Sequence, residues 1–207
     1  MQDAALTLLD AASLTRALAR CCDALEAAAP ELNALDARLG DGDLGTTLAK
    51  CAANLRELLA APPASLPALL KGCAQACARA SGSSFGTLLA VAFLTAAKTV
   101  DGREALDLEA LVHLLDEVGA ALSQRGGAAQ GDKTMLDSLA AIASALRHAK
   151  ERSPEVLKVA AQTATGQALD AFRNRPNRIG RARMFAERSM GLDDPGMVAV
   201  QRMVQAL

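Results

Sequence analysis

Residues 65–80 read SLPALLKGCAQACARA, and this segment shows the pattern that sets the fold. Ser65 is a suitable N-cap, and Pro67 lies in the first turn, where a helix does not need every backbone N–H. Apolar residues then recur at intervals of three and four, as they do along the buried face of an amphipathic helix. The segment therefore predicts a helix over residues 66–80.

The same spacing recurs along the rest of the chain, and we see no strand-like alternation of period two. Aromatic residues make up only 2% of the sequence, with no Trp and no Tyr, so Ala, Leu, Val and Met must build the core. Ala and Leu favour helices, whereas aromatic and β-branched residues favour strands. The other expected helices are one marked by Leu6 to Leu25, then 46–60, 86–99, 106–124, 133–149, 154–172 and one after Asp194-Pro195-Gly196. An all-α fold of eight helices follows.

Bulk properties narrow the class of protein. The chain has 207 residues and no long linker, so we expect a single domain over 1–207. With a net charge of −1 and no long basic run, nucleic acid is a poor candidate as a partner. The longest apolar stretch, Leu88 to Ala97, is shorter than the roughly 20 residues that span a bilayer. The start, Met1-Gln2-Asp3, lacks the basic region of a signal peptide, so we expect a cytoplasmic protein without a membrane partner.

The five cysteines do not indicate a disulfide framework, because their number is odd. Cys73 and Cys77 are one helical turn apart and could suit a metal, but the two histidines, His113 and His148, lie far away in the sequence. We interpret the cysteines as small buried apolar residues in a reducing compartment.

Four polar, glycine-containing segments interrupt the helices: Gly40–Thr47, Ser81–Gly86, Arg125–Thr134 and Gly191–Gly196. An even number of helices separates each segment from the next. In an up-and-down bundle, an even number of helices returns the chain to the same end. All four segments are therefore expected at one end, and three of them lead directly into helix N-termini, which favour phosphate.

Residues 36–47, DARLGDGDLGTT, carry the clearest chemical signal. Three carboxylates alternate with glycines that permit tight turns, so the carboxylates can converge. Hard oxygen ligands suit Mg²⁺ or Ca²⁺, and the absence of a downstream glutamate argues against an EF-hand. Mg²⁺ held between carboxylates and phosphates fits better. The alternative is a solvated Asp/Gly turn that caps the helix at Thr46.

The other three segments are less specific by themselves. Residues 81–86, SGSSFG, suit either phosphate contacts or an N-cap. Residues 126–135, GGAAQGDKTM, are not a P-loop, because no strand precedes them and the glycine spacing differs, so they suit a flexible helix–helix loop equally well. The arginines of 178–183 could bind phosphate or form a solvated basic face.

Taken together, four motifs in order resemble the L subunit of dihydroxyacetone kinase (DhaL), the nucleotide-binding half of that enzyme. They are GDGD at 40–43 followed by Gly45, GDKTMLD at 131–137, GRAR at 180–183 and ERSMGLDDPG at 187–196. The resemblance implies an eight-helix antiparallel up-and-down barrel with the nucleotide site at one rim. It also implies ADP or ATP with two Mg²⁺ ions and a phosphotransferase activity.

The resemblance assigns site residues position by position. The implied Mg²⁺ ligands are Asp36, Asp41 and Asp43. The implied phosphate-binding residues are Gly45, Thr46, Thr47, Ser83 and Ser84. The remaining implied nucleotide contacts are Gly126 and Met135 at the adenine, Arg181, and Asp194, Pro195 and Gly196, which close over the nucleotide. No catalytic residue is implied beyond these metal and phosphate ligands.

The resemblance also implies partners, and the sequence departs from the family at two positions. Dihydroxyacetone or a related short ketose would be bound by a separate ketose-binding subunit, and the donor would be ATP or a phosphoprotein of the sugar phosphotransferase system. Leu44 stands where the family commonly has a phosphate-contacting histidine, and Phe85 stands where a second small polar residue is usual. These departures leave open a catalytically weak or inactive nucleotide-binding regulatory protein of the same fold.

Overall fold

The computed structural model describes residues 9–80 and 84–207, and these residues form eight α-helices. Their bounds are α1 Ala11–Asp36, α2 Leu44–Leu59, α3 Leu66–Arg79, α4 Ser84–Thr99, α5 Leu108–Gly126, α6 Met135–Arg147, α7 Pro154–Arg173 and α8 Pro195–Gln205. Two short 3₁₀ helices, η1 Arg181–Phe185 and η2 Glu187–Ser189, lie between α7 and α8. The expectation of an all-α fold is confirmed.

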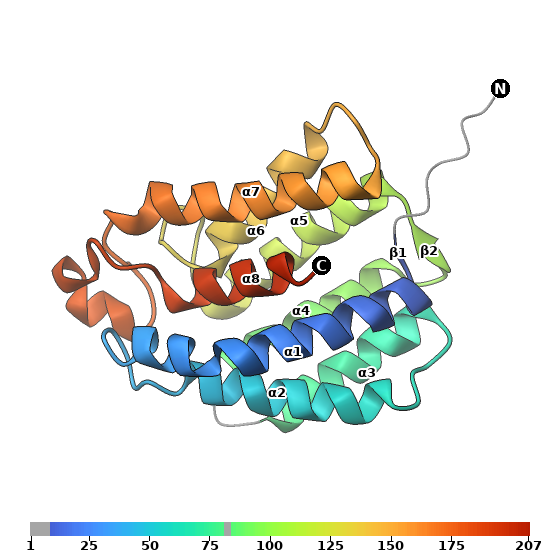
Figure 1. Ribbon diagram of the computed structural model, residues 1–207, viewed down its shortest axis with the longest axis horizontal. Coiled ribbons are helices and arrows are strands. Elements are labelled where there is room, and N and C mark those ends of the chain that lie inside the picture. The colour runs from blue at the N-terminus through green and yellow to red at the C-terminus, as the bar shows by residue number, and fades with distance from the viewer. Residues whose placement is uncertain (1–8, 81–83) are drawn as a thin grey trace.

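The eight helices form a closed antiparallel ring. Each helix packs against the next one in the chain, and α8 returns to pack against α1. In Figure 1, α2, α4, α6 and α8 all begin toward the left end of the molecule, and the other four helices run the opposite way. The N-termini of these four helices therefore share one rim, as the helix count predicted.

Side-chain caps explain why several helices begin where they do. Ser65, Asp107 and Ser153 each accept a hydrogen bond from a backbone N–H in the first turn of α3, α5 and α7. Thr134 and Asp137 form a reciprocal capping box at α6. At the other end of α5, Gly127 adopts a φ of 68°, which glycine reaches without steric cost.

The core is built from small and aliphatic residues, as the composition required. Buried leucines, alanines, valines and cysteines make up nearly all of it. All five cysteines are free thiols, and four of them are buried, which agrees with their interpretation as small apolar residues. No helix among the described residues is both long enough and apolar enough to cross a membrane.

Some helix boundaries differ from the sequence expectation. Leu9–Asp10 (β1) pairs with Ala105–Leu106 (β2) in a two-residue antiparallel bridge, too short to show as alternation in the sequence. Consequently α1 begins at Ala11, where Asp10 caps it, and α5 begins at Leu108. Leu6, at the start of the expected first helix, lies outside the described residues.

The expectation that the sixth helix begins at Lys133 was also wrong. Lys133 has a φ of 62°, a left-handed conformation that cannot belong to a right-handed helix. Thr134 caps the helix, which then begins at Met135. The second helix begins two residues earlier than expected, at Leu44, whose backbone N–H donates to the Asp36 carboxylate.

Candidate functional site

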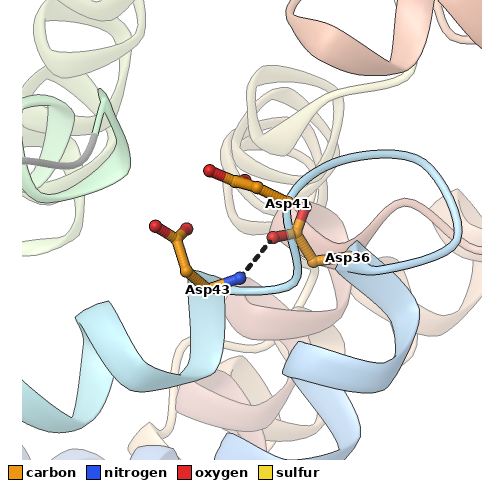
Figure 2. Close-up of side chains that lie close together, drawn as sticks. All are labelled: Asp36, Asp41 and Asp43. Carbon is orange, nitrogen blue, oxygen red and sulfur yellow. Dashed lines mark hydrogen bonds between the residues drawn. The ribbon is translucent and has the colours of Figure 1, made fainter.

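Three aspartates meet where α1 ends and α2 begins. Asp36 is the last residue of α1, Asp41 lies in the connecting loop, and Asp43 immediately precedes α2. One carboxylate oxygen from each lies within 4.8 Å of the other two, and Figure 2 shows the three side chains around a common space. Asp41 and Asp43 are exposed and Asp36 is half-buried, so the cluster is open to solvent. The donor set and its spacing fit a hard divalent cation such as Mg²⁺.

Asp36 also holds the loop together. Its Oδ2 accepts hydrogen bonds from the backbone N–H of Asp43 at 3.0 Å and of Leu44 at 3.3 Å, and the first of these is drawn in Figure 2. A Cβ on Gly40 would lie only 2.6 Å from Asp36 Oδ1, and Gly42 has a φ of 75°. The two glycines therefore allow the chain to turn tightly around the Asp36 carboxylate.

The first turn of α2 presents only one of its three predicted phosphate-binding residues to solvent. Thr46 is exposed, and its hydroxyl accepts a hydrogen bond from Asn33 Nδ2 at 3.0 Å. The Asn33 Oδ1 in turn accepts from the Thr46 N–H, also at 3.0 Å. Thr47 and Gly45 are buried. Asn33 was missed from the sequence, because an asparagine inside a helix carries no signal of its partner in another helix.

Leu44, at the unusual position, contributes to the core rather than to the rim. Its side chain is 7% exposed and belongs to a hydrophobic cluster to which α1, α2, α3, α4, α7 and α8 contribute. Only its backbone N–H reaches the aspartate loop, through Asp36. The side chain at this position therefore adds packing and no polar contact.

Arg181 connects the stretch between α7 and α8 to the first segment. It lies at the start of η1, and its guanidinium forms an ion pair with the carboxylate of Asp41. Both side chains are largely exposed, so the pair is screened by water and can exchange partners easily. A positive group thus stands beside the carboxylate cluster, although the two lie 140 positions apart along the chain.

The second, third and fourth segments also meet. A Cβ on Gly196 would lie 3.2 Å from Phe85 Cε2 and 3.9 Å from Met135 Cβ. A Cβ on Gly86 would lie 3.6 Å from Thr47 Cγ2, which joins the second segment to the first. The predicted residues Met135 and Gly196 therefore lie close together. Phe85, at the start of α4, lies against the start of α8.

The remaining predicted residues have more varied surroundings. Ser84 is exposed as the first residue of α4, and Ser83 lies outside the described residues. Gly126 is the exposed last residue of α5, and a Cβ there would lie 3.7 Å from Leu88 Cδ2. Pro195 is buried in the first turn of α8.

Asp194 caps α8 and anchors the loop before it. Its carboxylate accepts hydrogen bonds from Met197 N–H at 2.9 Å and from Asn177 Nδ2 at 2.8 Å. Burial raises the pKa of this carboxyl to about 6, against the opposing effect of these hydrogen bonds and of the nearby Lys133 ammonium. The predicted binding residue Asp194 thus has a structural role at the helix N-terminus.

We expect Asp194 to make stability depend on pH in an unusual direction. Its carboxyl holds a proton up to about pH 6 in the folded chain but titrates near its ordinary pKa of 3.8 when unfolded. The stability that it contributes is therefore fully present below about pH 4 and is lost as pH rises through 6. Each unit of pKa shift corresponds to about 1.4 kcal/mol.

Denaturant titrations of the wild type and Asp194→Asn at pH 4 to 7 measure this contribution. The free energy of unfolding of the wild type, minus that of the variant, should fall as pH rises across this range. A difference that is constant or rises with pH would contradict the assignment.

Comparisons with known proteins identify the family of the chain. The chain matches the family model of the DAK2 domain over residues 38–207. It is 29% identical over 194 residues to the ADP-binding subunit DhaL of PEP-dependent dihydroxyacetone kinase from Escherichia coli (strain K12), covering 92% of each chain. It is 32% identical over 194 residues to human triokinase/FMN cyclase, covering 92% of this chain but 33% of the human protein.

A solved structure shows the same arrangement of helices. The dihydroxyacetone kinase from C. freundii in complex with AMP-PNP and Mg²⁺ superposes with a TM-score of 0.73 at 25% identity, covering 100% of this chain and 35% of that one. The chain thus spans about a third of the human and C. freundii proteins and nearly all of the E. coli subunit. Because the family model covers most of the sequence, the chain belongs to the DAK2 domain family.

Proposed function

We propose that this chain binds ADP or ATP with Mg²⁺ at the shared rim and serves as the nucleotide-binding subunit of a dihydroxyacetone-type kinase. The observation that carries the proposal is the convergence of Asp36, Asp41 and Asp43 at the N-terminus of α2, beside Arg181. Carboxylates suit Mg²⁺, whereas arginine and helix N-termini suit phosphate. Both kinds of group are needed around a nucleoside di- or triphosphate.

Each residue then has a distinct role. Asp36, Asp41 and Asp43 would hold Mg²⁺, which we propose as two ions and which supplies charge neutralisation at the phosphates. The exposed Thr46 at the N-terminus of α2, where the helix dipole favours anions, would contact phosphate oxygens. Arg181 would leave Asp41 and pair with the nucleotide. Met135 and Gly126 would line the adenine pocket, with Gly196 closing over it.

We propose phosphoryl transfer to dihydroxyacetone or a related short ketose that is held by a ketose-binding partner subunit. The names of the E. coli and C. freundii relatives support this acceptor. The PEP-dependent designation of the E. coli relative supports a phosphoprotein of the sugar phosphotransferase system as the phosphoryl donor. ATP is the alternative donor. This chain would contribute positioning and charge neutralisation, without a covalent intermediate of its own.

Leu44 supports a second candidate, a nucleotide-binding regulator with weak or no catalysis. Because its side chain lies in the core, position 44 offers no hydrogen-bond donor to a phosphate. Nucleotide would still bind through the aspartates and Arg181. The two candidates therefore differ in turnover and not in binding.

Two measurements test the proposal. Calorimetric titration with ADP and ATP should show binding that requires Mg²⁺ and is lost in the Asp41→Ala/Asp43→Ala variant. Phosphorylation of dihydroxyacetone is then measured with the ketose-binding subunit present, with ATP and with the phosphoprotein donor in separate assays. Turnover supports the kinase subunit, and binding without turnover supports the regulator. Failure of the wild type to bind nucleotide, even with the ketose-binding subunit present, would refute both.

A further inference from the structure

Lys133 is the one large charged side chain that the described part of the structure buries completely. Its exposed fraction is 0%, yet it forms no direct ion pair. Instead, Nζ donates to three backbone carbonyl oxygens: those of Arg173 at 3.0 Å, Arg175 at 2.9 Å and Ser189 at 2.8 Å. An ammonium group has three N–H donors, so all of them are satisfied.

The three carbonyls belong to the two ends of one stretch of chain. Residues 174–190, here the arginine segment, connect α7 toward α8 and contain only the two short 3₁₀ helices. Arg173 and Arg175 lie where the segment begins, and Ser189 lies where it ends. Lys133 therefore closes the segment into a loop by binding both of its ends at one point.

Further hydrogen bonds tie the arginine segment to the same turn. Asn177 Nδ2 donates to the Lys133 carbonyl at 3.0 Å, and Arg178 N–H donates to the Asp132 carbonyl at 3.2 Å. The Asn177 N–H donates to Ser189 Oγ at 2.8 Å, which links the two ends directly. The turn at 132–133 thus anchors the arginine segment through these hydrogen bonds.

The backbone of Lys133 is held in a costly conformation. Its φ of 62° lies in the left-handed region, which is sterically unfavourable for a residue with a Cβ. Glycine would adopt it freely but would provide no ammonium group. The contacts of the buried side chain therefore compensate for the strain at this position.

The arginine segment carries Arg181 to the carboxylate cluster. Its Asn177 also donates to Asp194, the cap of α8. We propose that Lys133 is a positioning residue, which holds the arginine segment in place so that Arg181 stands beside the nucleotide site before any ligand binds. Only the part concerning ligand affinity rests on the proposed nucleotide-binding function.

Limited proteolysis of the ligand-free protein tests the structural part. Trypsin can cut the segment after Arg178, Arg181, Arg183 and Arg188. We expect Lys133→Met, which keeps the length of the side chain but removes its donors, to speed these cuts by about tenfold. Cleavage elsewhere and the helical circular dichroism should stay unchanged. The control Lys158→Met, at an exposed position on α7, should match the wild type.

Two outcomes would overturn this part: unchanged cleavage in the segment, or faster cleavage at all sites alike, which indicates global destabilisation. Should Lys133→Met not fold, Asn177→Ala removes one tie between the segment and the Lys133 carbonyl. The same cuts should then be faster, and a folded Asn177→Ala with unchanged cleavage would refute the proposal.

A double-mutant cycle tests whether Lys133 acts through Arg181. Lys133→Met and Arg181→Gln should each weaken Mg²⁺-ADP binding by about tenfold. If Lys133 acts by placing Arg181, the double variant should bind about as weakly as Arg181→Gln alone. If the double variant instead loses affinity by the product of the two single losses, Lys133 does not act through Arg181. A wild type that binds no nucleotide would refute the proposed function and leave the proteolysis result standing.

Discussion

Replacing Asp36 by alanine is expected to abolish Mg²⁺-dependent nucleotide binding and also to destabilise the fold. Asp36 is both one of the three clustered carboxylates and the acceptor of two backbone N–H groups at the start of α2. Asp43 contributes a carboxylate to the same cluster, and its side chain makes no cap hydrogen bond to α2. Asp43→Asn should therefore remove binding while leaving stability nearly unchanged.

We expect both variants to lose about a hundredfold or more in affinity for Mg²⁺-ADP, measured by calorimetry. Only Asp36→Ala should also lower the free energy of unfolding, by about 1–3 kcal/mol, since it leaves two N–H groups without their acceptor. Asp101→Asn makes the same charge change at the far end of α4 and should alter neither quantity. Wild-type affinity in Asp43→Asn would show that the cluster does not hold the metal.

Among the glycines that the structure describes, Gly45→Ala is expected to be the most destabilising glycine-to-alanine change. A Cβ at this position would lie 2.0 Å from the Ala29 carbonyl oxygen of α1, and 2.7 Å from its carbonyl carbon. These are backbone atoms, so the clash can be relieved only by separating α1 from α2. We expect a loss of about 3 kcal/mol or more in the free energy of unfolding.

Gly119→Ala provides the matched control. Gly119 lies within α5, and a Cβ there would meet nothing within 4 Å. The added methyl group should raise helix propensity and stabilise the protein by about 0.5–1 kcal/mol. Urea denaturation of both variants makes the comparison. A Gly45→Ala variant as stable as the wild type would mean that α1 and α2 do not approach so closely.

These two glycines also show where a sequence stops being informative. Both occur in helices, and nothing in the flanking residues reveals which of the two another helix approaches closely. The motif resemblance assigned Gly45 to phosphate contact, whereas the structure shows in addition that it permits close packing of two helix backbones. Asn33 and Asn177 were likewise not singled out, since each bonds a residue distant in sequence.

The helices, and the prediction that four polar segments meet at one rim, came from the sequence alone. Apolar spacing of three and four, N-caps such as Ser65 and Ser153, and glycine-bearing turns are local signals, since helices form between residues at most a few positions apart. Counting helices then placed the four polar segments at one rim. The converging aspartates could be anticipated because all three lie within eight residues.

The contacts between residues far apart in the chain could be seen only in the folded structure. Lys133 looked like part of a helix start, but it is buried beneath a segment that begins 41 residues later. Arg181 meets Asp41, and Gly196 meets Phe85, through closure of the ring of helices. Burial, ion pairing and close packing depend on the atoms of all the surrounding elements together, so local spacing could not reveal them.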